Sequence, residues 1–249
     1  MNRLDRIIVL AASVGERIII CGGEIERAED SAHRICTAYG LENISVFALN
    51  SVIIVTAADK ESCFTHSIRI NVISPCMKAL ENINGFSRQI CNNPVDIEKA
   101  MAMLDDIALE NPKSKKILGE IITAVAFTMF FYGSLSDIAC TVFIVILLHF
   151  QKSGLEKINL RQYMGYVVLT FATGMLIQLL RRLSICDNPQ AIMHGCFMSM
   201  FPGISLVNAS LSFLSSNTIS AILQLVHSIL TAISIAAGFA FSAFVFGIF

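Results

Sequence analysis

Apolar and polar residues follow one pattern in the first 112 residues and another in the remainder. In the first part, runs with helical spacing enclose shorter runs that are typical of strands. The predicted helices are residues 4–18, 24–39, 77–90 and 95–109, and the predicted strands are residues 44–49, 52–57 and 63–70. This pattern predicts a compact α+β head domain, residues 1–112, with the element order ααβββαα.

The second part consists of apolar runs long enough to cross a bilayer, and it predicts an all-α transmembrane domain, residues 113–249. Its first run, residues 117–150, would be about 51 Å long as one helix, against a hydrocarbon core of about 30 Å. We therefore predict a break at Gly133-Ser134 and a hairpin of two short helices. The expected bundle of about five helices has spans at residues 117–132, 136–151, 163–184, 190–208 and 218–249, and a single tilted helix in place of the hairpin would leave four.

The distribution of charge supports this division. Of the 37 charged side chains, 28 lie in residues 1–116, and residues 188–249 contain none. A charge placed in hydrocarbon costs about 2.5 to 3.5 kcal/mol, so the second part is predicted to be embedded in a membrane. Lys113, Lys115 and Lys116 precede the first span, and the positive-inside rule then places the head in the cytoplasm.

Composition argues against several other classes of protein. A net charge of −1 without any basic run predicts no nucleic-acid partner. A signal peptide is the alternative to the first amphipathic helix, because Arg3 and Arg6 precede an apolar stretch, but Asp5 interrupts the basic region and no convincing cleavage site follows. The eight cysteines have neither C-x-x-C spacing nor a histidine at ligand spacing. We therefore predict no metal site, no other cofactor and no disulfide framework, and expect the cysteines to be small buried hydrophobic residues.

Several motifs along the chain carry a family resemblance. The first is the run Gly22-Gly23-Glu24-Ile25-Glu26-Arg27-Ala28-Glu29-Asp30, of which Gly22, Gly23, Glu24, Arg27, Glu29 and Asp30 form the head-domain motif; later patches are Ser67-Ile68-Arg69-Ile70, Ile83-Asn84-Gly85-Phe86-Ser87-Arg88, Met103-Leu104-Asp105-Asp106-Ile107, Tyr132-Gly133-Ser134 with Asp137, and Phe201-Pro202-Gly203-Ile204 with Leu206 and Asn208. Together they make the chain similar to the threonine/serine exporter family over nearly its whole length.

The resemblance implies a secondary exporter in the bacterial plasma (inner) membrane that carries threonine and serine or short dicarboxylates. It also implies a two-component arrangement, in which this chain is the half with the head and a separate membrane protein supplies the second half. The expected partners are therefore that second-half protein, the lipid bilayer and a small-molecule substrate, and a homo-oligomer is compatible with the sequence.

One departure from the family pattern sets up an alternative. Many members have charged residues after the P-G-x-x-L-x-N motif and in the last helix. The corresponding positions here are Leu211, Ser212, Ser216, Asn217, Gln224 and His227. Because ionisable groups inside a membrane usually carry ion coupling and substrate recognition, their loss favours a second hypothesis, a non-transporting, membrane-anchored relative whose head docks or senses something.

Two sites in the membrane part are candidates for the substrate path. Asp137, with Ser134 close by, could bind a substrate amine or a proton, and the alternative is a helix N-cap or an interfacial carboxylate. Pro202 and Gly203 interrupt a span, and broken helices bind substrates in many transporters, with Asn208 one or two turns later able to donate and accept hydrogen bonds. The alternative is a kink with an asparagine that serves packing alone.

The remaining candidates have simpler interpretations beside them. His227 could titrate near neutral pH in place of a lost carboxylate, or be a neutral, hydrogen-bonded packing residue. The small residues of 234–243 are expected to form a helix interface. The head carboxylates could support acid–base catalysis, but neither a nucleophile with a base nor a phosphate loop accompanies them. We therefore expect a salt-bridged face and no enzyme.

Overall fold

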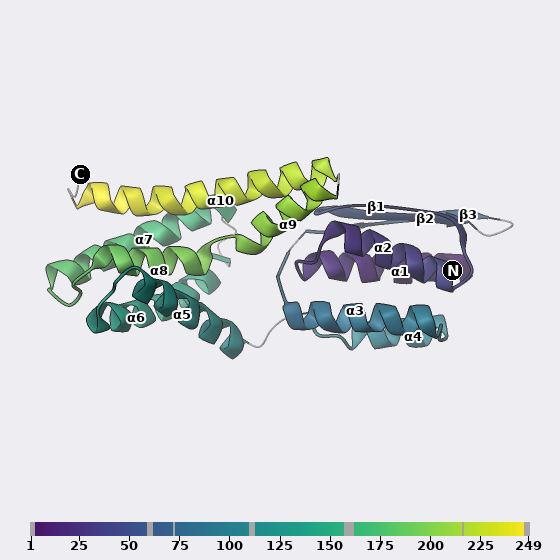
Figure 1. The fold of residues 1–249 in the computed structure, drawn as a ribbon, viewed down its shortest axis with the longest axis horizontal. Helices are drawn as coiled ribbons and strands as arrows, with labels where there is room; N and C mark the ends of the chain where they lie inside the picture. Colours follow the sequence, from purple (N-terminus) through teal and green to yellow (C-terminus); the bar gives the residue numbers. More distant parts are fainter. Residues whose placement is uncertain are drawn as a thin grey trace. The chain divides into compact units, whose positions relative to one another are not determined.

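The computed structural model describes residues 3–58, 62–71, 73–109, 113–156, 162–215 and 217–246. These residues form ten helices and one three-stranded sheet (Figure 1). The chain divides into two compact units, one made of Met1–Asn111 with Ile204–Leu225 and the other of Pro112–Gly203 with Val226–Phe249. Each unit is therefore built from two separate stretches of the chain.

The first unit has the element order that the sequence predicted. Its elements are α1 (Arg3–Ile20), α2 (Ile25–Ala38), β1 (Glu42–Leu49), β2 (Val52–Ala58), β3 (Cys63–Arg69), α3 (Met77–Asn92) and α4 (Ile97–Asp105), followed much later by α9 (Gly203–Leu214) and the start of α10 (Thr218–Val245). Helices α1 and α2 lie between the sheet and helices α3 and α4 (Figure 1). The head is thus a three-layer α+β arrangement.

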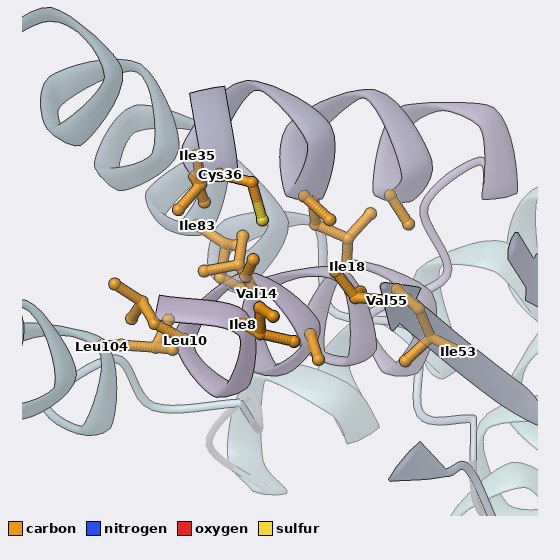
Figure 2. Packing of buried hydrophobic residues seen from close by; sticks show 14 of the residues in the cluster. Ile8, Leu10, Val14, Ile18, Ile35, Cys36, Ile53, Val55, Ile83 and Leu104 are labelled. Atoms are coloured by element: carbon orange, nitrogen blue, oxygen red, sulfur yellow. The ribbon is translucent and has the colours of Figure 1, made fainter. Parts of the chain in front are cut away.

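Helix α1 is the centre of this unit. Ten of its 18 residues are buried, including Ile8, Leu10 and Val14, because sheet, α2, α3 and α4 all contact it. Figure 2 shows these side chains in one cluster with Ile35 of α2, Ile83 of α3 and Leu104 of α4. The apolar face predicted for residues 4–18 is therefore a core face, and α1 is not among the candidate membrane spans of the described residues.

The sheet is an antiparallel meander in the order β1-β2-β3. Its central strand buries every second residue, Ile53, Val55 and Ala57, while the residues between them are half-buried. This period of two is what one covered face of a sheet requires. On the other face the hydroxyls of Thr56 and Thr65 form a cross-strand hydrogen bond at 2.9 Å.

The second unit is entirely helical. It contains α5 (Lys113–Phe130), α6 (Leu135–Glu156), α7 (Gln162–Arg182), α8 (Pro189–Met200) and the later part of α10. In the described part of the chain, α6, α7 and α10 are long and apolar enough to cross a membrane, and a fourth span results if α8 and α9, bent by 53° at their break, count as one. The expectation of about five spans was too high by this measure, because α5 carries four charged residues, Lys113, Lys115, Lys116 and Glu120.

The predicted break at Gly133-Ser134 is present, and local hydrogen bonds account for it. At the end of α5 the Tyr132 amide bonds to the Met129 carbonyl and the Gly133 amide to the Thr128 carbonyl, with Tyr132 in the left-handed region (φ 61°). This is the pattern of a Schellman C-cap. Helix α6 then starts at the second residue after Gly133, so one apolar stretch becomes a hairpin.

Small residues bring the helices of the second unit close together. A Cβ on Gly238 of α10 would lie 2.0 Å from Thr170 Oγ1, and one on Gly174 of α7 would lie 2.0 Å from Ser242 Oγ. Gly238 and Ser242 therefore form a helix interface with α7, as expected for this stretch, whereas Ala236 and Ala240 are exposed. Six of the eight cysteines are buried, as predicted, but Cys63 is exposed at the start of β3 and Cys91 is half-buried.

Gly23→Ala is expected to destabilise the full-length protein. A Cβ there would lie 2.7 Å from Ile18 Cγ2 and 2.9 Å from the Ile18 carbonyl oxygen, so the backbone must shift, at a cost of about 1–3 kcal/mol. The control Gly85→Ala, in helix α3 with nothing within 4 Å of the new Cβ, should gain about 0.5–1 kcal/mol. Thermal unfolding of both variants in detergent measures the difference, and equal melting temperatures would contradict the prediction.

Candidate functional site

The two glycines of the head-domain motif form the C-cap of α1. The Gly22 amide bonds to the Ile19 carbonyl at 3.0 Å and the Gly23 amide to the Ile18 carbonyl at 2.9 Å, while Gly22 has a φ of 81°. Only glycine adopts this left-handed conformation without strain. The Gly22 carbonyl accepts a hydrogen bond from Asn208 Nδ2 at 3.0 Å. Two motifs 186 residues apart in the sequence therefore meet inside the first unit.

Glu29 of the same motif makes a second contact of this kind. Its carboxylate accepts the Ala48 amide at 2.7 Å and a hydrogen bond from the Asn217 side chain. Burial raises the pKa of Glu29, with a smaller contribution from Glu26, and the two hydrogen bonds oppose the rise. The half-buried motif carboxylate thus links α2, β1 and the start of α10.

A third contact completes what we call the head seam, the set of hydrogen bonds from residues 204–225 to the rest of the first unit. Gln224 Nε2 donates to Asn50 Oδ1 at 3.2 Å. Ser212 and Gln224 are both buried. Asn217 and Gln224, which the resemblance places where many family members have charged residues, both form hydrogen bonds to residues of the head. Ser216 lies outside the described residues.

The other charged residues of the motif lie on the surface. Arg27 pairs with Glu24 at 3.6 Å, and Arg34 pairs with Asp30 at 2.9 Å, with most of these side chains exposed. A shallow hollow of about 510 Å³ beside them is lined by Glu26, Glu29, Asp30, His33, Ile44, Ser45 and Val46. Among the described residues, no group of three or more His, Cys, Asp or Glu is placed to hold a metal. This is the geometry of a salt-bridged face.

In the second unit, Asp137 holds two helix starts together. Its Oδ2 accepts the amide and the hydroxyl of Ser134, each at 2.9 Å, while the Ser134 hydroxyl also lies 3.3 Å from the Asp137 amide. This reciprocal pair is a capping box at the start of α6. Oδ1 accepts the amides of Asp187 and Asn188, at 2.9 and 3.0 Å, just before α8. The side chain is completely buried, and each carboxylate oxygen has two donors.

Asp187 lies next to this arrangement and is exposed. Its Oδ2 lies 2.8 Å from the hydroxyls of both Ser134 and Ser136. Ser134 is therefore placed between two carboxylates, Asp137 and Asp187. Asp137 and Asn208, both expected on one substrate path, belong to different units.

The Pro202 motif does interrupt a helix, as predicted. Helix α8 ends at Met200, Phe201 is extended, and α9 begins at Gly203. Proline has no amide hydrogen to donate, so α8 cannot continue through Pro202 without losing a hydrogen bond. His227, the last predicted site residue, lies 2.9 Å from the hydroxyl of Tyr163 at the start of α7 through its Nδ1. The side-chain partner of His227 in this hydrogen bond is thus the phenol group of Tyr163.

The second unit also contains a group of ionisable residues that was not predicted from the sequence. Glu120 of α5 lies 3.1 Å from His149 and 3.2 Å from Lys152, both on α6. Two signals pointed to it: Glu120 is the one acidic residue between Glu110 and Asp137, and His149 and Lys152 are three apart and so share a helix face. Neither signal shows that the two helices face each other at these residues.

The chain was also compared with known proteins. Residues 9–246 match the model of the family described as "Putative threonine/serine exporter". The chain belongs to this family. No curated protein and no solved structure matches it. With its apolar helices, membership of the threonine/serine exporter family makes the chain an integral membrane protein of a transporter class.

Asp137→Asn is expected to destabilise the second unit of this exporter-family protein. The carboxamide has one acceptor oxygen, and its NH₂ group would face amide donors, so buried donors lose their partners at a cost of about 1–3 kcal/mol. Asp187→Asn, at an exposed side chain that accepts only hydroxyl hydrogen bonds, should change the stability by less than about 0.5 kcal/mol. Denaturation of the full-length variants in detergent tests this, and equal stabilities would show that the Asp137 network is dispensable.

Glu29→Gln is expected to make the stability of the protein less dependent on pH. Since the pKa of Glu29 is raised in the folded protein, the wild type loses stability as the pH rises from the ordinary value of 4.5 through the raised pKa. The glutamine side chain stays neutral at every pH. The stability of the variant relative to the wild type should therefore be higher at pH 7 than at pH 4. Asn217→Ala removes a hydrogen bond that lowers the pKa of Glu29, so it should enlarge the pH dependence. Melting curves between pH 4 and 7 would contradict this if all three proteins showed the same slope.

Proposed function

We propose that the protein is one subunit of a two-component secondary exporter for threonine and serine or for short dicarboxylates. A separate membrane protein supplies the second half, and both lie in the bacterial plasma membrane with the head in the cytoplasm. The observation that carries the proposal is the family match over residues 9–246. The chain itself acts as a transporter subunit and performs no catalysis.

The break between α8 and α9 supports this function. Transporters commonly bind small polar substrates at helices that are interrupted inside the membrane, because the ends of half-helices offer backbone donors and acceptors. Here an apolar segment is interrupted at Phe201-Pro202 and bent by 53°. In the proposed exporter, Pro202 and Gly203 lie on the substrate path, with Asn208 on the helix that follows.

Asp137, Ser134 and His227 contribute to the path as positioning residues in this proposal. The carboxylate of Asp137 fixes the starts of α6 and α8, and α8 leads to the break. His227 is hydrogen-bonded to Tyr163, which ties α10 to α7. The head seam supports the alternative, a docking or sensing relative, because residues 217 and 224 are neutral and bonded to the head.

Efflux of labelled threonine, serine and succinate tests the proposed function. Cells expressing this chain together with its candidate second half should export at least one of these substrates, and cells expressing either protein alone should not. Efflux by this chain alone would refute the two-component arrangement. No efflux with both proteins verified in the membrane would favour the docking or sensing relative.

A pair of proline variants in the same cells tests the helix break. Pro202→Ala restores an amide and lets α8 continue, so most of the efflux should be lost. Pro189→Ala is the matched control, because proline in the first turn of α8 replaces an amide that has no helical partner. Equal efflux by the two variants would remove the break from the substrate path.

A further inference from the structure

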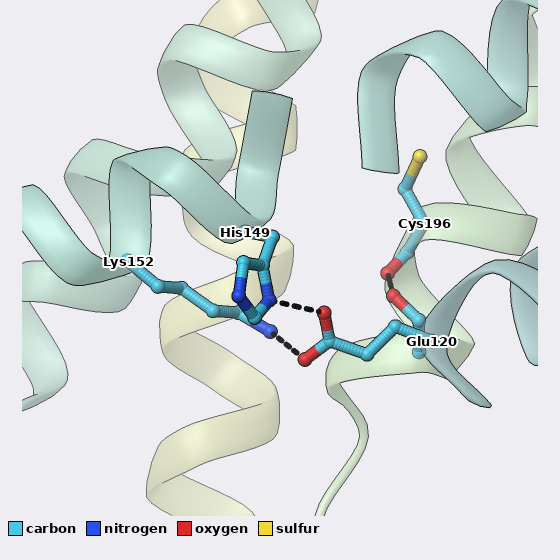
Figure 3. A network of polar contacts seen from close by, with 5 residues as sticks. Glu120, His149, Lys152 and Cys196 are labelled. Atoms are coloured by element: carbon cyan, nitrogen blue, oxygen red, sulfur yellow. Dashed lines mark hydrogen bonds and ion pairs between the residues drawn. The ribbon is translucent and has the colours of Figure 1, made fainter. Parts of the chain in front are cut away.

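Three ionisable side chains of the second unit gather between the two helices of the α5–α6 hairpin. Figure 3 shows the Glu120 carboxylate pointing at His149 and Lys152. Oε2 lies 3.1 Å from His149 Nδ1, and Oε1 lies 3.2 Å from Lys152 Nζ. Each carboxylate oxygen therefore has its own nitrogen partner. We call these three residues the hairpin cluster.

The side chains of the hairpin cluster are largely shielded from solvent by the rest of the protein. The side chains of Glu120 and His149 are 14% and 13% exposed, and that of Lys152 is 29% exposed. Moving charges out of water is costly, and a buried ion pair rarely stabilises a protein more than apolar residues of the same size do. Apart from this cluster, the hairpin carries charges at Lys113, Lys115, Lys116, Asp137 and Glu156, and the cluster joins α5 to α6 through contacts of 3.1 and 3.2 Å. Ionisable groups of this kind in membrane helices usually mark ion or proton pathways.

The composition of the cluster suits a proton. With a neutral imidazole, the charges of Glu120 and Lys152 cancel. Uptake of one proton by His149 gives an imidazolium, whose Nδ1–H then donates a charge-assisted hydrogen bond to the Glu120 carboxylate. Histidine is the side chain whose unperturbed charge changes between about pH 5 and 8. The cluster can thus hold an extra positive charge while its contacts remain in place.

The helices packed around the hairpin carry further titratable side chains. Helices α7 and α8 contact α6, and α8 also contacts α5. On α8, His194 is exposed and stacked on Phe131, and Cys196 is completely buried. On α7, Tyr163 bonds to His227, Arg182 lies over the Phe246 ring, and Tyr166 and Arg181 complete the set. On α5 itself, Lys115 and Lys116 are exposed.

We propose that Glu120, His149 and Lys152 form the proton-coupling site of the exporter. The inference rests on the proposed function, and it deepens it by naming the coupling ion and its carrier. A proton from water on one side of the membrane adds to the imidazole of His149, Glu120 stabilises the imidazolium, and the same proton leaves to water on the other side as the transport cycle is completed. No covalent bond other than N–H forms or breaks.

The test separates coupling from folding and from substrate binding. The full chain and its second half are reconstituted in vesicles, and two rates are measured for the substrate found above: efflux driven by an imposed pH gradient, and exchange of labelled for unlabelled substrate without a gradient. His149→Gln and Glu120→Gln should lose gradient-driven efflux by about tenfold, within the usual range of coupling between sites. Exchange should fall much less, and the pH dependence of driven efflux between about pH 5 and 8 should flatten.

Two further variants serve as controls. Lys152→Arg keeps the positive charge beside Glu120 and should keep most of the driven efflux. His194→Gln removes an exposed histidine of α8 and should leave both rates and the pH profile as in the wild type.

Each outcome decides between the possibilities. Driven efflux with an unchanged pH profile in His149→Gln overturns the coupling site while the proposed function stands. Equal losses of exchange and driven efflux would mean that the cluster only holds the hairpin together, which also overturns it. If the wild-type pair shows neither exchange nor driven efflux of any substrate, the proposed function fails, and the coupling role fails with it.

Discussion

A backbone amide or carbonyl that leaves water must find a hydrogen-bond partner inside the protein, and the breaks in this chain depend on that requirement. The 34-residue apolar stretch becomes a hairpin because a C-cap at Tyr132-Gly133 and a capping box at Ser134 and Asp137 satisfy both helix ends within six residues. The same Asp137 carboxylate then takes the amides in front of α8. One buried side chain thus fixes where two helices start, and α8 in turn leads to the break at Pro202.

Local signals in the sequence were sufficient for the order of elements in the first unit and for both helix breaks. The reason is that apolar periodicity, capping residues, glycine and proline act within a few residues of the structure they determine. The span count was less predictable, because Lys115, Lys116 and Glu120 belong to α5 and lower its hydropathy without ending the helix.

Long-range partners account for what the sequence could not predict. Nothing local indicates that Asn208 bonds to the Gly22 carbonyl or that Asn217 reaches Glu29. Residues 204–208 and 218–225 were predicted to belong to membrane spans, yet they lie in the same compact unit as the head. Likewise, Glu120 and His149 are 29 residues apart, and only the register of the hairpin brings them together. The head-domain motif itself was recognised without its physical role, which is a C-cap and a half-buried carboxylate that bonds to the later segment.

The kinds of polar group in the two units differ in a way that bears on transport. In the head seam, Asn208 and Gln224 bond through neutral amides, which donate and accept without a counter-ion, so these two contacts do not change when a proton binds. The third contact, from Asn217, is made to the ionisable carboxylate of Glu29. Asp137 is ionisable, but its two oxygens already accept four hydrogen bonds, and protonation would break at least one of them. The hairpin cluster combines an acid, a base and a fixed positive charge in direct contact. Residues 188–249 contain no charged side chain, whereas the first hairpin carries a group whose net charge one proton can change.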